Sequence, residues 1–563
     1  MRAFSIGARL LAGLVAALMV SGLAACSNAR DGSLKSESEL TEATQPAAPA
    51  ETVAFDTDVE VSKALFERAE AAVVASTEPV AQARAAAVAG VLSIPMLTET
   101  SAGDVGAELT RLGVKTVLAV GAVDVVADVD VMTDAGNVQA LSTVLGSEVR
   151  VTDEFGVDDL LSLDPANVTV PEFDPQTAAE DVTEHPAQTE QTGEEKAETV
   201  LESTEAAPTS RMVDLASLPR GERGKANPNA VGFATQDSPL GVVANALTAG
   251  LDVSVLAQAD PRATSESMKL MREGRVAVGL GPDFGGTQML AQTAQLATSA
   301  DELPGGGGLV FPGRRMVALY GHPKLAALGA LGEQSPTEAA QLALQYAQQY
   351  QQFSDVPVIP AFEIIATVAS AGAGDDGLYS DVTPAADLAS SVDAVTEVGG
   401  YAIIDLQPGH AKLLDQAQLY AELLKRPNVG LALDPEWKLY GDQVHLQQVG
   451  HVEIAEVNEV SQWLAELVRD NNLPQKVFML HQFQLQMIRD RDQMVQHPEL
   501  ATVVHVDGHG SPEAKMHTWD VIREDMQPWV WMAWKNFIDE DQPMLNAEQT
   551  MGIEPRPWFV SFQ

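Results

Sequence analysis

The stretch Val429-Gly430-Leu431-Ala432-Leu433-Asp434-Pro435-Glu436-Trp437 has the pattern that decides the fold: a short apolar run that ends in polar side chains. Seven similar runs occur in the C-terminal part of the chain, most of them followed by a helical segment. The eight runs cover residues 316–320, 357–364, 401–405, 429–434, 477–481, 502–506, 530–534 and 559–562. Buried-type strands that alternate with helices over about 250 residues predict a (β/α)8 barrel, here residues 305–563. A doubly wound open sheet is the alternative.

Polar residues follow most of these runs, at the expected carboxyl ends of the strands. They are Tyr320, His322, Glu363, Asp405, His481, Gln482 and Lys535. In a (β/α)8 barrel such ends meet at one mouth, where catalytic groups come from several strands. We therefore predict a site there, with binding residues Asp405, His481, Gln482 and Lys535. The alternative for any single member is that a polar residue ends a strand because it meets solvent.

Asp434 and Glu436 form the most informative pair in this set. On an extended strand, residues i and i+2 point to the same face, so both carboxylates would face the mouth. Two close carboxylates raise the pKa of one of them, which gives the protonated acid and ionised partner that glycosidic cleavage requires. Asp434 and Glu436 are thus the predicted catalytic residues. Trp437 would stack on a sugar ring or, alternatively, belong to the core.

The run from Gly430 to Trp437 resembles the fourth-strand Asp-x-Glu of two glycoside hydrolase families, the family 25 lysozyme-like enzymes and the family 18 chitinases. The resemblance implies that Glu436 is the general acid and Asp434 the assisting carboxylate. Family 18 carries two further Asp upstream, where this chain has Val429 and Ala432.

A second group suggests metal chemistry. His505, Asp507 and His509 alternate at the end of one expected strand, and imidazole with carboxylate is a ligand set for zinc or another divalent ion. A metal-dependent hydrolase is therefore a separate hypothesis, with these three residues as ligands. The alternative is that the histidines bond to loop carbonyls.

Two segments upstream of the barrel, residues 56–171 and 230–304, have a similar order of strand-like and helical runs at an offset of about 160 residues. We predict two small related α/β units, with chance similarity as the alternative. Ile94-Pro95-Met96-Leu97-Thr98 and Leu112-Gly113-Val114 resemble the cell-wall-binding repeat of Gram-positive surface proteins, which implies attachment to the wall. Residues 26–55 and 172–229 are rich in Glu, Thr, Ala and Pro and predict a flexible tether and a disordered acidic linker.

The first 25 residues have the parts of an export signal: basic residues, an apolar run, and Leu23-Ala24-Ala25-Cys26. This tetrapeptide resembles the lipobox of bacterial lipoproteins, which implies lipidation of Cys26 and an anchor on the outer face of the cytoplasmic membrane. An uncleaved membrane helix and an ordinary secretory signal are the alternatives. Cys26 is the only cysteine, so its lipidation would leave no free thiol, and we then expect no disulfide and no thiolate ligand or nucleophile.

The formal net charge of −45 describes a surface that repels nucleic acid and anionic headgroups. The expected partners are therefore the membrane, through the lipid, and a cell-wall polysaccharide or peptidoglycan, with no nucleic acid.

The C-terminal part also resembles a set of uncharacterised secreted proteins of high-GC Gram-positive bacteria. The residues that carry this resemblance are 404–409, 433–437, 481–483, 507–510 and 534–537. The leading hypothesis is an envelope lipoprotein whose barrel binds or hydrolyses a cell-wall glycan. The alternatives are a non-catalytic wall-binding or scaffolding lipoprotein and the metal-dependent hydrolase.

Overall fold

The computed structural model describes residues 49–174 and 210–563. The export signal, Cys26, most of the predicted tether and residues 175–209 of the predicted linker lie outside the described residues, so lipidation and export remain predictions. Within the described ranges, no helix combines the length and the apolar composition that crossing a membrane requires.

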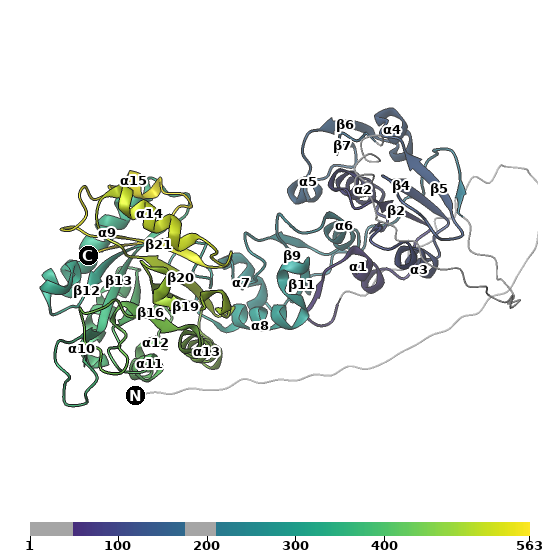
Figure 1. Ribbon diagram of the computed structural model, residues 1–563. Coiled ribbons are helices and arrows are strands. Elements are labelled where there is room, and N and C mark those ends of the chain that lie inside the picture. Colours follow the sequence, from purple (N-terminus) through teal and green to yellow (C-terminus); the bar gives the residue numbers. More distant parts are fainter. Residues whose placement is uncertain (1–48, 175–209) are drawn as a thin grey trace, which may run out of the picture. The chain divides into compact units, whose positions relative to one another are not determined.

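The C-terminal region is a closed parallel barrel of eight strands (Figure 1). The strands are β12 (Arg315–Gly321), β13 (Val358–Ala369), β15 (Tyr401–Leu406), β16 (Val429–Leu433), β18 (Lys476–His481), β20 (Leu500–Val506), β21 (Trp531–Asn536) and β22 (Phe559–Phe562). Each strand pairs in parallel with its neighbours in the sequence of strands, and β12 closes the ring by pairing with both β13 and β22. The predicted (β/α)8 barrel is confirmed, and the open sheet is excluded.

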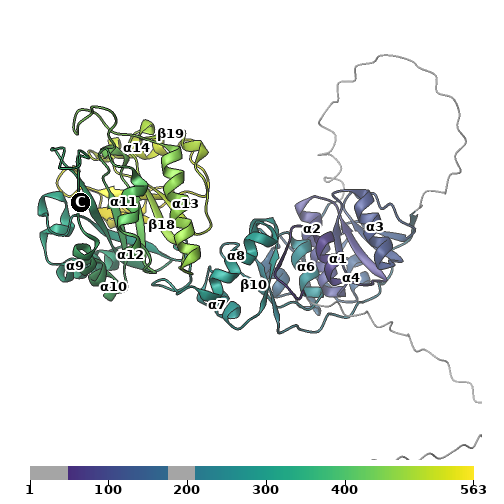
Figure 2. The same ribbon diagram turned by 90° about the horizontal axis from the view of Figure 1, so that it is seen from below.

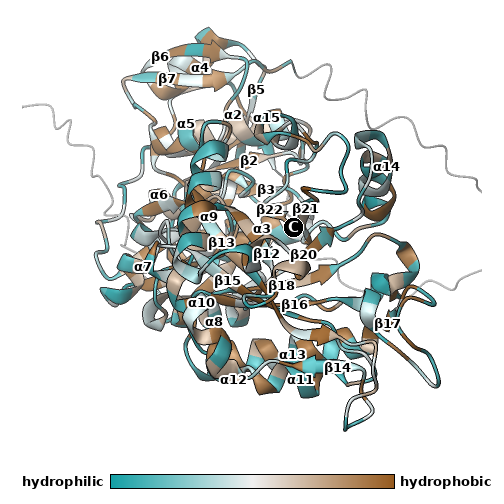
Figure 3. Cartoon of the chain, turned by 90° about the vertical axis from the view of Figure 1, so that its left-hand side faces the viewer, coloured by the Kyte–Doolittle hydropathy of each residue, from teal (hydrophilic) through white to brown (hydrophobic). Residues whose placement is uncertain are grey.

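Helices cover the outside of the barrel, as the turned view shows (Figure 2). They are α9 (Pro336–Gln351), α10 (Ala385–Glu397), α11 (Leu413–Leu419), α12 (Ala421–Leu424), α13 (Ile454–Asp470), α14 (Pro512–Arg523) and α15 (Ala547–Met551). The ribbon of α13 carries both hydrophobic and hydrophilic colours (Figure 3), because Val457, Val460 and Leu464 are buried while other positions are polar. Ser335 caps α9 in a reciprocal box with Glu338.

The side chains of each barrel strand point alternately outward and inward, so they form two separate hydrophobic cores. One contains strand residues such as Phe478 and Leu480 together with buried residues of the surrounding helices, so it lies between strands and helices. The other contains Val477, Met479 and their counterparts on all eight strands but no residue of those helices, so it fills the barrel. Because successive side chains of a strand point to opposite faces, parity decides which residues face inward at the mouth.

The N-terminal body contains two parallel sheets. The first has the order β3-β2-β4-β5-β8 and the second β1-β11-β9-β10. The strands of the first are β2 (Ala71–Ala75), β3 (Met96–Thr98), β4 (Thr116–Val120), β5 (Asp130–Asp134) and β8 (Arg211–Met212); those of the second are β1 (Val53–Phe55), β9 (Ala230–Ala234), β10 (Val253–Val255) and β11 (Val276–Leu280). The orders β3-β2-β4 and β10-β9-β11 correspond, so the two units share a topology.

The helices of this body are α1 (Asp58–Leu65), α2 (Pro79–Leu92), α3 (Ala102–Leu112), α4 (Val138–Leu145), α5 (Val157–Leu161), α6 (Leu240–Thr248), α7 (Ser265–Arg272) and α8 (Gly286–Ser299). A further pair of strands is β6 (Glu148–Thr152) with β7 (Asn167–Pro171). Residues of both units form one buried cluster. Buried Asn245 of α6 links the units, because its amide bonds to the backbone N–H and carbonyl of Met96 (both 2.8 Å).

Two short strands of this body lie in segments that the sequence assigned elsewhere. Strand β1 falls in the predicted tether and pairs with β11, and β8 falls in the predicted acidic linker and pairs with β5. Neither is visible in composition, because a strand of two or three residues at the edge of a polar segment gives almost no periodicity.

Candidate functional site at the mouth of the barrel

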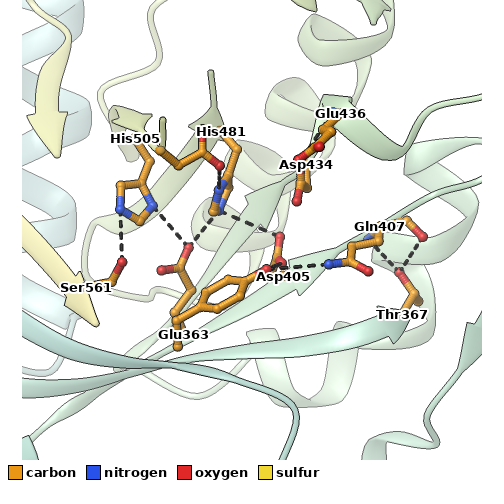
Figure 4. Close-up of polar contacts among 11 residues, drawn as sticks. Glu363, Thr367, Asp405, Gln407, Asp434, Glu436, His481, His505 and Ser561 are labelled. Atoms are coloured by element: carbon orange, nitrogen blue, oxygen red, sulfur yellow. Dashed lines mark hydrogen bonds and ion pairs between the residues drawn. The ribbon is translucent and has the colours of Figure 1, made fainter. Parts of the chain in front are cut away.

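One inward-facing layer of polar side chains closes the carboxyl end of the barrel (Figure 4). Each strand contributes one residue to this layer, namely the next inward-facing residue after those of the apolar barrel interior. The eight members are Tyr320, Glu363, Asp405, Asp434, His481, His505, Lys535 and Ser561, none of them more than 3% exposed. Burial of so many ionisable groups in one layer makes it the candidate functional site of the barrel.

His481 lies at the centre of this layer. Its Nε2 is 2.7 Å from Oε1 of Glu363, and its Nδ1 is 2.9 Å from Oδ2 of Asp507. A third carboxylate, Asp405, has Oδ1 3.9 Å from the same Nε2. Burial alone would lower the pKa of His481, but Glu363 and Asp507 outweigh it and raise the pKa well above its usual value.

His505 lies beside His481 on the next strand, with ring centroids 4.8 Å apart. Its Nε2 is 3.1 Å from the hydroxyl oxygen of Ser561, and its Nδ1 is 3.4 Å from Oε1 of Glu363. Burial lowers the pKa of His505. The pKa shifts therefore favour the charged form of His481 and the neutral form of His505 beside the same glutamate.

Asp405 is held on the other side of His481. The Tyr320 hydroxyl donates to Asp405 Oδ2 at 3.1 Å, and Gln407 Nε2 lies 3.5 Å from that hydroxyl. The Lys535 ammonium lies 3.6 Å from the centre of the Tyr320 ring. Burial raises the pKa of Asp405 to about 6, against the opposing charges of His481 and Lys535.

Asp434 belongs to this layer and Glu436 follows it, but the two residues are not in the predicted extended arrangement. Strand β16 ends at Leu433, and Pro435–Trp437 forms a turn of 3-10 helix. Asp434 caps this turn, since its Oδ1 accepts from the Glu436 backbone N–H at 3.2 Å. The chain turns here because a proline fits the first position of a helical turn after a capping aspartate.

The two carboxyls differ in exposure and have raised pKa values. Asp434 is buried, and burial raises its pKa well above the usual range. Glu436 is half-buried, and its pKa rises to about 7 because of burial first and the charge of Asp507 second. The pKa of Asp507 is lowered, because the hydrogen bond and charge of His481 outweigh its burial. Near neutral pH Glu436 is therefore partly protonated, while Asp507, whose charge contributes to the raised pKa of Glu436, is ionised.

Several buried acceptors of this site have no hydrogen-bond partner among the described residues. They are Glu363 Oε2, Asp405 Oδ1 and Asp507 Oδ1. Leaving a buried polar group unsatisfied costs about 1–3 kcal/mol, and more for a charged one. These three carboxylate oxygens are buried acceptors of the site that the described residues leave without a hydrogen bond.

The other predicted residues have separate positions. Gln482 is buried and holds the loop after β18: its Nε2 donates to the carbonyls of Gln484 and Leu485, and its Oε1 accepts from Arg491. Trp437 is half-buried with its ring 5.5 Å from that of His445. The predicted metal set is not brought together, because His509 is exposed and its ring lies 5.7 Å from Phe537.

Glu363 and Tyr320 were predicted at strand ends without a specific role, and Ser561 was not predicted. Strand parity identifies all three, since Ile359 and Ala361, Met316 and Ala318, and Phe559 belong to the barrel interior. The next inward-facing residues of these strands are Glu363, Tyr320 and Ser561.

No protein-family model matches the chain, and no curated protein matches it. A functional assignment therefore depends on the chemistry of the mouth itself.

Proposed function

We propose that the barrel hydrolyses a glycosidic bond in a cell-envelope glycan, with Glu436 as the general acid. The observation that carries this proposal is the half-buried Glu436 carboxyl, whose pKa of about 7 keeps a proton available at neutral pH, near the ionised Asp507. A protonated and an ionised carboxyl at one site are the equipment of glycosidases.

In this mechanism Glu436 donates its proton to the leaving oxygen as the bond to the anomeric carbon breaks. Asp507 accepts a proton from the water that attacks that carbon, so that one bond is cleaved and one water consumed. His481 orients Asp507 through the 2.9 Å hydrogen bond. Asp434 orients the acid by capping the turn that carries it.

Aromatic side chains support a sugar as the substrate. Trp437, which follows the acid in the chain, is half-buried, as are His445 and Tyr379. The ring centroid of His445 lies 5.5 Å from that of Trp437 and 6.5 Å from that of Tyr379. Half-exposed aromatic faces suit the apolar faces of sugar rings. The predicted lipid anchor at Cys26 would place the barrel at the outer face of the membrane, and the net charge of −45 disfavours anionic polymers such as nucleic acid.

Substitution of Glu436→Gln in the full chain tests the proposal. With purified peptidoglycan and wall polysaccharide as substrates, the release of reducing ends should fall about 10²–10⁴-fold, the usual contribution of a general acid. The matched control is Glu422→Gln, an exposed glutamate of α12, which should act like the wild type. Unchanged turnover in Glu436→Gln would show that this residue is not the acid. Binding of wall polymer without turnover by the wild type would favour the non-catalytic wall-binding alternative.

A further inference from the structure

We propose that Glu363, His481 and His505 bind a divalent transition-metal ion inside the barrel mouth. One donor atom from each residue lies within 4.8 Å of the others, and all three side chains are fully buried. The Glu363 Oε1 atom is 2.7 Å from Nε2 of His481 and 3.4 Å from Nδ1 of His505. This set differs from the one predicted from the sequence and shares only His505 with it.

The outer nitrogens of both imidazoles are already occupied. Nδ1 of His481 bonds to the Asp507 carboxylate at 2.9 Å, and Nε2 of His505 lies 3.1 Å from the Ser561 hydroxyl. Metal-binding histidines typically use one ring nitrogen for the ion and the other for a carboxylate or hydroxyl that fixes the ring. Both rings therefore turn their remaining nitrogen toward Glu363, as Figure 4 shows.

Unsatisfied atoms point to a ligand at this place. Nδ1 of His505, Oε2 of Glu363 and Oδ1 of Asp405 are buried without a hydrogen-bond partner among the described residues. The last of these lies 3.9 Å from Nε2 of His481, where it would act as an additional ligand. The hydrogen bonds among the described residues leave all three atoms unused, whereas a cation between them would use each one.

The donor types select the class of ion. Two imidazole nitrogens with carboxylate oxygens suit zinc, manganese or iron, whereas magnesium and calcium prefer oxygen ligands only. Two histidines and one glutamate are also a ligand set of catalytic zinc sites, in which the protein supplies three ligands. The inference uses residues other than Glu436 and does not depend on the proposed glycan chemistry.

Zinc binding by the full chain tests the proposal without any substrate. After treatment with a chelator, the protein should take up one equivalent of zinc in equilibrium dialysis with elemental analysis. His481→Gln and His505→Gln should each weaken binding by more than about 100-fold, and Asp507→Asn by roughly 10–100-fold, as expected of a residue behind a ligand. His509→Gln is the matched control. This exposed histidine lies on the loop after β20, as Asp507 does, so the variant should bind zinc like the wild type.

Two results would overturn the proposal: no stoichiometric zinc in the wild type, or full binding in both His481→Gln and His505→Gln. X-ray absorption of the zinc-loaded wild type avoids variants that fail to fold. It should show two imidazoles at about 2.0–2.1 Å from the ion, and fewer than two would also reject the site. Glu436→Gln should retain its zinc, so loss of glycan turnover and loss of metal are separate outcomes.

Discussion

The N-terminal body and the barrel mouth both bury charged side chains, but they treat them differently. In the N-terminal body, Arg84 of α2 donates to both carboxylate oxygens of Asp134, with the shorter contact at 2.6 Å, and to the carbonyl of Pro171 at 3.1 Å. Asp134 Oδ1 also accepts from the Gly136 backbone N–H. Neither residue has an unpartnered side-chain atom.

The barrel mouth instead contains several buried carboxylates that are not fully hydrogen-bonded. Glu363, Asp405 and Asp507 each keep one buried oxygen without a partner among the residues that the structure describes. The contrast separates two uses of buried charge. A closed pair fixes the packing of its elements, whereas an open network holds groups in protonation states that chemistry at the mouth would use.

Breaking the closed pair should have the largest effect on stability. We expect Arg84→Met to cost about 3–5 kcal/mol, because it leaves the Asp134 carboxylate buried and unpaired. Urea denaturation followed by circular dichroism measures the loss. Arg150→Met is the control, since the Arg150–Glu148 pair is mostly exposed and should contribute less than about 1 kcal/mol. A similar loss in both variants would mean that the buried Arg84–Asp134 pair contributes no more than an exposed pair.

Glu436 connects this open network to the pH dependence of stability, because the charge of Asp507 contributes to its raised pKa. The pKa of Glu436 is raised from 4.5 to about 7, so the folded chain binds more protons than the unfolded chain between these values. The stabilising contribution of its proton is therefore complete below pH 4.5 and is lost as the pH rises through about 7.

Comparison of the wild type with Glu436→Gln isolates this contribution. From pH 5 to pH 8 the wild type should lose about 1–2 kcal/mol relative to the variant, less than the full shift would give because the carboxyl is half-exposed. Urea denaturation across this range, with chelator present, is the measurement. A constant difference between the two proteins would mean that Glu436 has an ordinary pKa.

The barrel could be predicted from the sequence because its strands are short, apolar and separated by helices. All eight expected runs overlap the observed strands, and the ends differ by a few residues except in β13, which continues to Ala369. The strongest signal in the sequence was the continuous apolar run of each strand. Such runs occur because the strands are buried on both faces and do not alternate polar and apolar residues. The edge strands β1 and β8 give no such signal.

The site could be predicted only in part. Asp405, His481, Lys535 and His505 do meet at the mouth, because parallel strands bring their carboxyl ends together. Two local assumptions were responsible for the differences. Continuing an extended strand past Leu433 ignored the turn that Asp434-Pro435 begins, and continuing one past Val506 to His509 ignored the end of β20.

Lys535 offers a smaller test of the open network. Its charge lowers the pKa values of both Glu436 and Asp405. Lys535→Met should therefore raise the pKa of Glu436 further above 7, on the order of half a unit to one unit. The measurement compares the free energy of unfolding of Lys535→Met with that of the double variant Lys535→Met/Glu436→Gln across pH. The pH at the midpoint of the change in this difference reports the pKa of Glu436. Lys425→Met, at an exposed position of the barrel, should leave the midpoint unchanged. A midpoint at lower pH would contradict the assigned role of Lys535.

Substitution of His509 should have the smallest effect on stability, although the sequence predicted His509 and His505 as ligands of the same metal ion. The two histidines stand four residues apart, yet His505 is fully buried between Glu363 and Ser561 while His509 is exposed at the loop. We expect His509→Ala to change the free energy of unfolding by less than about 0.5 kcal/mol, as at most surface positions. His505→Ala should cost clearly more, because it leaves a cavity and removes the partner of Ser561. Urea denaturation of both variants under one condition measures the difference. Equal losses would mean that the loop after β20 packs His509 into the mouth. His509 would then belong to the buried network of the mouth together with His505.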